Sequence, residues 1–263
     1  MAILQIEVLS GYLERKVPVT AIVPIDNPLT KVQEENYKMV VLLHGYNGNN
    51  MDWVTNTGIV KYAEENNLVV VMPAGENKFY IDNIKTGEAY GRFIGEELIA
   101  CMRKLLPVST KREDTCIGGL SMGGFGAVVN GLRFPDTFGY IVSLSGALFL
   151  EPMMSEKNEE VLIRKEKFDA LLGTSEQMLH TDADYRETLE NLLKKNPQKI
   201  PEIYLACGTD DFWYRASESF SKYLTHMNVG HLFVETKADH EWSFWNCYIE
   251  KAIKWFGNRG AAV

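Results

Sequence analysis

The chain has 263 residues, of which 46% are hydrophobic and 24% are charged, a composition that excludes a disordered chain or a fibre. Its 35 acidic residues outnumber 27 basic ones, giving a net charge of −8, and no lysine or arginine cluster could follow a phosphate backbone. Nucleic acid is therefore not an expected partner. The length suits one α/β domain spanning residues 1–263.

Residues 2–24 are predicted to form two antiparallel edge strands with a turn near Ser10 and Gly11, because β-branched residues recur there in near alternation. The N-terminal segment has neither the basic start nor the long apolar run of a secretory signal. No stretch reaches the ~18 apolar residues that span a bilayer. A cytoplasmic protein with no membrane partner is the expectation.

Six short runs downstream are apolar on both faces, as strands covered on two sides require. They are residues 37–45, 67–73, 114–120, 139–146, 201–208 and 231–237. Segments of helical period lie between or after them. One has an apolar stripe of Ile94, Leu98, Met102 and Leu105, and another has one of Trp245, Ile249, Ala252 and Phe256. This alternation predicts a mostly parallel sheet with helices on both faces and a ligand site at the carboxyl ends of the strands.

The alternation stops between about Leu148 and Lys199, a stretch rich in charge and methionine that has no convincing strand. We interpret residues 148–199 as an insertion. Residues 158–173 and 183–196 are predicted helices that lie over the loops of the sheet as a small cap. A surface excursion with no role is the alternative.

Gly119-Leu120-Ser121-Met122-Gly123 matches the G-x-S-x-G motif between a predicted strand and a predicted helix. So sharp a turn strains the serine backbone, and glycines on either side avoid collisions between strand and helix. Ser121 is therefore the candidate nucleophile of a nucleophile elbow whose glycines are Gly119 and Gly123. The alternative is a glycine-rich turn that serves only close packing of the helix.

A serine nucleophile needs a base and an acid that orients the base. Asp210 and Asp211 follow one predicted strand, and His240 follows the next strand and precedes the last helix. The order serine, acid, histidine is that of α/β-hydrolases. Asp211, three residues after Gly208, is preferred as the acid, with Asp210 left open. An exposed loop histidine is the alternative for His240.

Hydrolysis of an ester also needs two amides that face the developing oxyanion. Met122, at the start of the predicted helix, should supply one of them. The loop 44–50, with the sequence HGYNGNN, should supply the other, from Tyr46 or alternatively Asn47. No His, Asp or Glu grouping has the spacing of metal ligands, and the four cysteines lie far apart, so neither a metal nor a disulfide framework is expected.

These motifs resemble a family of α/β-hydrolase esterases that includes esterase D, tributyrin esterases and bacterial feruloyl or cinnamoyl esterases. The resemblance rests on LLHGYNGNNMDW, VMPAGENKFYID, GGLSMGGFGA, CGTDDFWY and DHEWSFW, in order along most of the chain. It implies the α/β-hydrolase fold and a serine carboxylesterase without a cofactor, acting on short-chain acyl or feruloyl-type esters. Ser121, Asp211 and His240 would form the triad, and Tyr46 and Met122 the oxyanion hole. Feruloyl-type members carry an insertion that corresponds to residues 148–199.

Several alternatives stay open at this stage. Formylglutathione hydrolases in the wider group have a different sequence in the oxyanion loop, without HGYNG. This difference disfavours assigning the chain to the formylglutathione hydrolases. Acyl transfer to an alcohol would use the same triad, and a binding module that has lost activity is an alternative of another class. Activity should fall on acidification, because protonated His240 cannot accept a proton. Assembly into a homo-oligomer is left open. The aromatic candidates for the substrate pocket are Trp53, Tyr80, Phe212 and Trp213.

Overall fold

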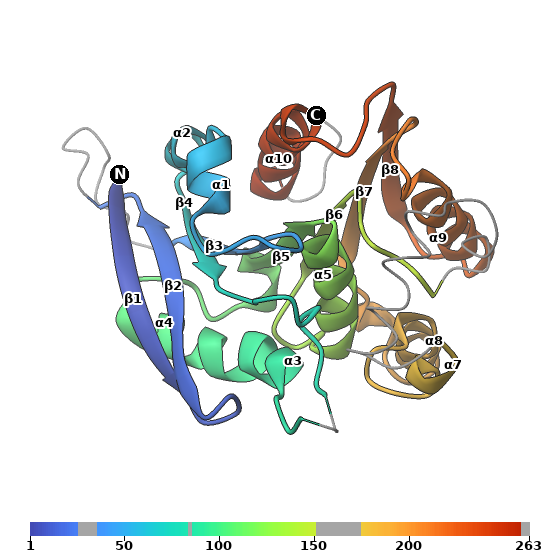
Figure 1. Ribbon diagram of the computed structural model, residues 1–263, viewed down its shortest axis with the longest axis horizontal. Helices are drawn as coiled ribbons and strands as arrows, with labels where there is room; N and C mark the ends of the chain where they lie inside the picture. The colour runs from blue at the N-terminus through green and yellow to red at the C-terminus, as the bar shows by residue number, and fades with distance from the viewer. Residues whose placement is uncertain (26–35, 84–85, 151–174, 259–263) are drawn as a thin grey trace.

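The structure, a computed structural model, describes residues 1–25, 36–83, 86–150 and 175–258. Within these ranges eight strands form one sheet in the order β1-β2-β4-β3-β5-β6-β7-β8 (Figure 1). Neighbours from β4 to β8 pair in parallel, whereas β2 is antiparallel to both β1 and β4. The strands are β1 (Ala2–Ser10), β2 (Arg15–Val23), β3 (Lys38–Leu43), β4 (Leu68–Pro73), β5 (Thr115–Leu120), β6 (Tyr140–Leu144), β7 (Glu202–Gly208) and β8 (His231–Thr236).

The α-helices of the described ranges are α1 (Asp52–Asn56), α2 (Ile59–Glu65), α3 (Tyr90–Arg92), α4 (Leu98–Leu105), α5 (Met122–Arg133), α7 (Ser175–Met178), α8 (Tyr185–Lys195), α9 (Tyr214–His226) and α10 (Trp242–Gly257). A π-helical turn, η1 (Phe93–Glu97), joins α3 to α4, and 3-10 turns occur at η2 (Arg112–Asp114) and η4 (Pro197–Lys199). None of these described helices is long and apolar enough to cross a membrane.

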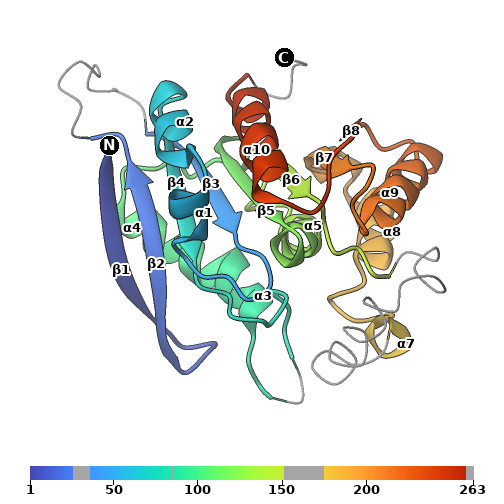
Figure 2. The ribbon, with the colours of Figure 1, turned by 45° about the horizontal axis from the view of Figure 1, so that its top comes forward.

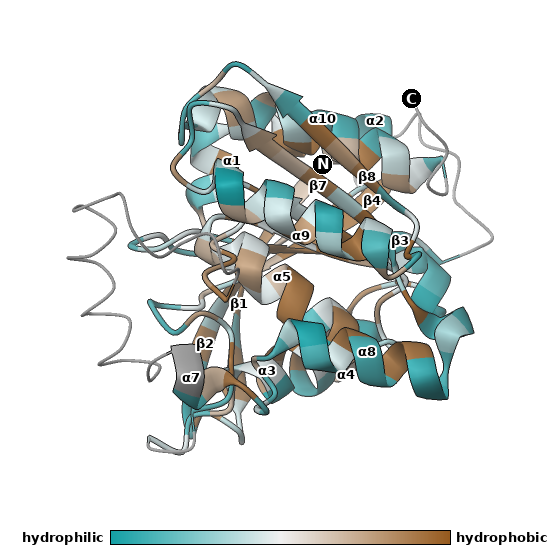
Figure 3. Cartoon of the chain, turned by 90° about the vertical axis from the view of Figure 1, so that its right-hand side faces the viewer, coloured by the Kyte–Doolittle hydropathy of each residue, from teal (hydrophilic) through white to brown (hydrophobic). Residues whose placement is uncertain are grey.

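The sheet separates two apolar cores, because successive side chains of a strand point to opposite faces. In β3, Val40 and Leu42 belong to the core under α1, α2 and α10. Met39, Val41 and Leu43 belong to the core under α3, α4, α5, α8 and α9. Figure 1 shows the two layers, and Figure 2 brings α2 and α10 forward. Apolar residues follow the strands in Figure 3, whereas α8 and α9 alternate between polar and apolar residues, as helices with one buried face do.

The predicted architecture is confirmed, with two local differences. The two N-terminal strands and the six apolar runs are all strands of the sheet. However, β8 is an edge strand that pairs only with β7, and none of its residues is buried. Leu105 is 55% exposed because it is the last residue of α4, and the buried stripe passes from Met102 to Leu106 instead.

The structure describes the second half of the expected insertion. Tyr185 of α8 is fully buried and contacts the rings of Phe125 in α5 and Phe220 in α9, so α8 belongs to the helical layer on one face of the sheet. The predicted helix at residues 158–173 lies outside the described residues. A cap formed by residues 148–199 therefore stays a prediction.

Candidate active site

Ser121 occupies the single position between the end of β5 and the start of α5. Its backbone angles, φ 52° and ψ −116°, lie in a region that costs a residue with a side chain free energy. Two hydrogen bonds hold it there: its N–H donates to the carbonyl of Leu144 at 2.9 Å, and its carbonyl accepts from the N–H of Ala147 at 3.0 Å. The strained turn is thus fixed from β6 and from the loop that follows β6.

The two glycines of the motif are required by the close approach of three elements. A Cβ on Gly119 would lie 2.5 Å from the carbonyl oxygen of Gly123. A Cβ on Gly123 would lie 2.4 Å from the carbonyl oxygen of Leu43, at the end of β3. Both obstacles are backbone atoms, which cannot turn aside as a flexible side chain can. Any larger residue would push α5 away from β3 and β5 and displace Ser121.

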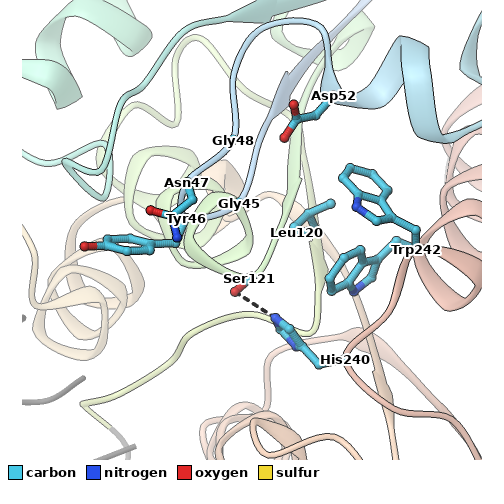
Figure 4. A pocket seen from close by; sticks show the side chains of 10 residues that line it. Gly45, Tyr46, Asn47, Gly48, Asp52, Leu120, Ser121, His240 and Trp242 are labelled. Carbon is cyan, nitrogen blue, oxygen red and sulfur yellow. Dashed lines mark hydrogen bonds between the residues drawn. The ribbon is translucent and has the colours of Figure 1, made fainter. Parts of the chain in front are cut away.

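His240 forms hydrogen bonds with two residues that lie far from it in sequence. Its Nε2 is 3.1 Å from Ser121 Oγ, and its Nδ1 is 2.9 Å from Asp211 Oδ2. The Asp211 side chain has no exposed surface, and its Oδ1 accepts from the N–H of Trp213 at 2.8 Å. A carboxylate only accepts hydrogen bonds, so Nδ1 donates to Asp211 and Nε2 is left to accept the serine proton. Figure 4 shows the bond between His240 and Ser121.

The neighbouring acids point elsewhere. Asp210 is exposed, and its N–H donates to the carbonyl of Ala238 at 3.1 Å, which ties the acid loop to the histidine loop. Asp239 accepts the backbone N–H of His240 through its carboxylate at 2.7 Å and so shapes the histidine loop. Of the two acids left open by the sequence, the structure brings Asp211 to the imidazole.

Aromatic rings hold the imidazole of His240 in place. Phe212 lies beside it with ring centroids 4.4 Å apart, and Trp245 meets it edge-on at 4.8 Å. Trp245 is itself anchored, because its Nε1–H donates to Ser145 Oγ at 3.0 Å. The imidazole can therefore turn little, and its Nε2 stays directed at Ser121.

The loop after β3 lies next to Ser121, with Tyr46 among the residues of the same pocket. The N–H of Asn47 donates to Asn77 Oδ1 at 2.6 Å and is therefore directed at a neighbouring loop. Met122 is the first residue of α5, where amides have no acceptor within the helix and the helix dipole favours negative charge. Of the two residues left open for the second amide, this geometry favours Tyr46 over Asn47.

Comparison with known proteins identifies the family. A family model described as "Putative esterase" matches residues 10–256. The chain belongs to this esterase family. An acetyl esterase of Caldicellulosiruptor saccharolyticus is 37% identical over 261 residues, which cover 97% of this chain and 98% of that relative.

Two solved structures of Staphylococcus aureus proteins are similar to the esterase. A substrate-bound fluorophosphonate-binding serine hydrolase aligns with a TM-score of 0.84 and 29% identity over 98% of both chains. An S-formylglutathione hydrolase aligns with a TM-score of 0.82 and 28% identity over 98% of this chain and 99% of the other. With these comparisons, the esterase is a serine carboxylic ester hydrolase of the α/β-hydrolase fold.

Behind the loop after β3, His44 is a buried structural element of the esterase. Its Nδ1–H donates to the Gly45 carbonyl at 2.7 Å, and its Nε2 accepts from the Gly75 N–H at 2.8 Å. Burial lowers the pKa of His44, which keeps the ring neutral so that Nε2 can accept this bond. The Tyr80 hydroxyl donates to the His44 carbonyl at 3.0 Å. Together, the hydrogen bonds of His44 with Gly75 and Tyr80 connect the start of the loop after β3 to the loop after β4.

A pocket of about 500 Å³ opens above Ser121 and His240 (Figure 4). Besides these two residues, its lining consists of the loop 45–48, Asp52, Leu120, Trp242 and Trp245. Trp242 and Trp245 lie in the first turn of α10, which begins two residues after His240. Both tryptophans follow His240 closely in the sequence, and this short spacing could have been used to predict that they lie at the site.

Of the four aromatic residues that were expected to line the pocket, Phe212 contacts the His240 ring and the other three lie elsewhere. Trp53 is 1% exposed, and its Nε1–H donates into the core to the carbonyl of Leu43 at 3.1 Å. Tyr80 is fully buried and its hydroxyl donates to the His44 carbonyl, and Trp213 is 3% exposed and its backbone N–H donates to Asp211. The expectation for Trp53, Tyr80 and Trp213 was therefore wrong, because each faces the core side of its loop or helix.

Proposed function

We propose that the esterase acts through an acyl-enzyme in which Ser121 is the nucleophile, His240 the general base and Asp211 the residue that orients His240. The observation that carries this proposal is the continuous chain of hydrogen bonds from Ser121 Oγ through both nitrogens of His240 to Asp211. No cofactor is needed, because the chain itself supplies the nucleophile, the base and the oxyanion donors.

The steps follow from this arrangement. Ser121 Oγ attacks the ester carbonyl carbon while its proton passes to His240 Nε2, and the carbonyl oxygen becomes an oxyanion that accepts from the amides of Tyr46 and Met122. The bond to the leaving oxygen then breaks, and His240 returns the proton to the departing alcohol. Water enters, loses a proton to His240 Nε2 and attacks the acyl carbon. The bond between the acyl carbon and Ser121 Oγ then breaks, and His240 returns the proton to Oγ, which releases the acid and restores Ser121.

We propose a short acyl group, with acetyl as the first choice. The support for this choice is that an acetyl esterase is 37% identical over almost the whole chain. Feruloyl-type esters are an alternative substrate class that the same mechanism would hydrolyse. Hydrolysis of S-formylglutathione is a second candidate, favoured by the likeness to the Staphylococcus aureus enzyme.

The test is a side-by-side assay of acetyl, butyryl and feruloyl esters and of S-formylglutathione, analysed by chromatography. Acetyl esters are expected to give the highest kcat/KM, with free acid as the product and no activity from Ser121→Ala. A transferred ester in place of free acid would assign the protein to acyl transfer. Folded protein that hydrolyses none of the four substrates would contradict the proposal.

A further inference from the structure

Asp52 places a carboxylate on the wall of the pocket opposite Ser121 and His240 (Figure 4). It is the first residue of α1 and is partly buried. Its Oδ2 lies close to Gly48: a Cβ added to Gly48 would be only 2.2 Å from this oxygen. Among the described residues that line the pocket, Asp52 is the only carboxylate, and there is no lysine or arginine. No described lysine or arginine forms an ion pair with it, so its charge is not neutralised by any of them.

The position of His240 indicates where the leaving group of an ester begins. The departing oxygen takes its proton from His240 Nε2, so the leaving group begins beside that ring. Trp242 and Trp245 adjoin His240 and continue the pocket lining from there. Trp242 is held between two edge-on rings, Trp53 at 5.5 Å and Trp245 at 5.2 Å. A leaving group on the Trp242 side of the site therefore faces Asp52.

We propose that Asp52 is a specificity-determining residue that selects against anionic leaving groups and favours those with hydroxyl or ammonium donors; this rests on the proposed function. A second negative charge in a partly enclosed cleft is repelled more strongly than in open water. Carboxylate oxygens also accept hydrogen bonds readily from such donors. An S-acylated glutathione carries two carboxylates and one ammonium group, so its net charge is negative, and this wall favours esters of neutral or polyhydroxy alcohols over glutathione thioesters.

A matched pair of substrates tests the charge alone. The esters 4-acetoxybenzamide and 4-acetoxybenzoate have the same acyl group and nearly the same shape, but only the second has an anionic leaving group. The ratio of kcat/KM for the amide over the acid is expected to fall on the order of tenfold in Asp52→Asn relative to the wild type. The difference in intrinsic reactivity between the two esters cancels, because the same ratio is compared between the variant and the wild type.

Asp210→Asn is the matched control, because it removes the same charge from a loop on the same rim of the sheet but outside the pocket lining. It should leave the ratio unchanged. Added salt should lower the wild-type ratio by screening Asp52, a readout that needs no variant. An equal ratio in Asp52→Asn and wild type, or an equal shift in Asp210→Asn, would overturn the role of Asp52. Failure of the wild type to cleave either ester would instead overturn the proposed function.

Discussion

His240 Nε2 lies 3.1 Å from Ser121 Oγ although 119 positions separate the two residues. The parallel sheet explains this convergence. Ser121 follows β5, Asp211 follows β7 and His240 follows β8, and all three strands end at the same edge. Loops at this edge meet wherever the strands occur in the chain, so a catalytic group can be assembled from distant segments.

Asp211→Asn is expected to lower kcat by about 10³–10⁴, because an amide can donate to Nδ1 and so favours the tautomer that cannot accept the serine proton. Steady-state hydrolysis of 4-nitrophenyl acetate measures this loss. Asp210→Asn, at the exposed neighbour, should change kcat by less than about twofold. Similar losses in both variants would contradict the assignment of the acid.

Gly123→Ala is expected to destabilise the protein by about 2–4 kcal/mol, because its Cβ would meet the Leu43 carbonyl oxygen. This cost outweighs the ~1 kcal/mol that alanine gains over glycine within a helix. Urea unfolding measures the net change in the free energy of unfolding, which contains both the clash and the gain in helix propensity. Gly230→Ala is the control, since a Cβ there meets nothing within 4 Å, and it should be neutral or stabilise by about 0.4–1 kcal/mol. Equal stability of the two variants would refute the close approach.

The buried His44 predicts a pH-dependent contribution to stability. Burial lowers its pKa in the folded state below the ordinary 6.5, so the unfolded state takes up a proton first as the pH falls. This contribution is fully present above about pH 6.5 and is lost progressively below it. In His44→Gln the difference in unfolding free energy from wild type should therefore be largest above pH 6.5 and should narrow on acidification. A difference that stays constant from pH 8 to pH 5 would show that His44 is not kept neutral by burial.

The sequence predicts the sheet well, because each buried strand is a short run that is apolar on both faces and is bounded by turn residues. It also predicts the order of the serine, the acid and the histidine, since these residues stand in loops that the strand pattern locates. The edge position of β8 could not be read in this way, because apolar runs do not state which strands are neighbours.

The pocket lining was the least predictable part of the site. Asp52 and Trp53 are adjacent at the start of α1, yet one faces the pocket and the other the core. Which of two neighbours points inward depends on the packing of the tryptophan against β3, where its Nε1–H finds the Leu43 carbonyl. A prediction based on aromatic character alone selected Trp53 and did not include its smaller charged neighbour, Asp52.

Covalent labelling with a fluorophosphonate tests the central claim most directly, because the reagent reports an activated serine whatever the natural substrate. Intact-protein mass spectrometry should show one adduct on the wild type, and peptide mapping should place it on Ser121. Ser121→Ala, with an unchanged circular dichroism spectrum, should show none. An unlabelled wild type, or an adduct that persists on Ser121→Ala, would contradict the account.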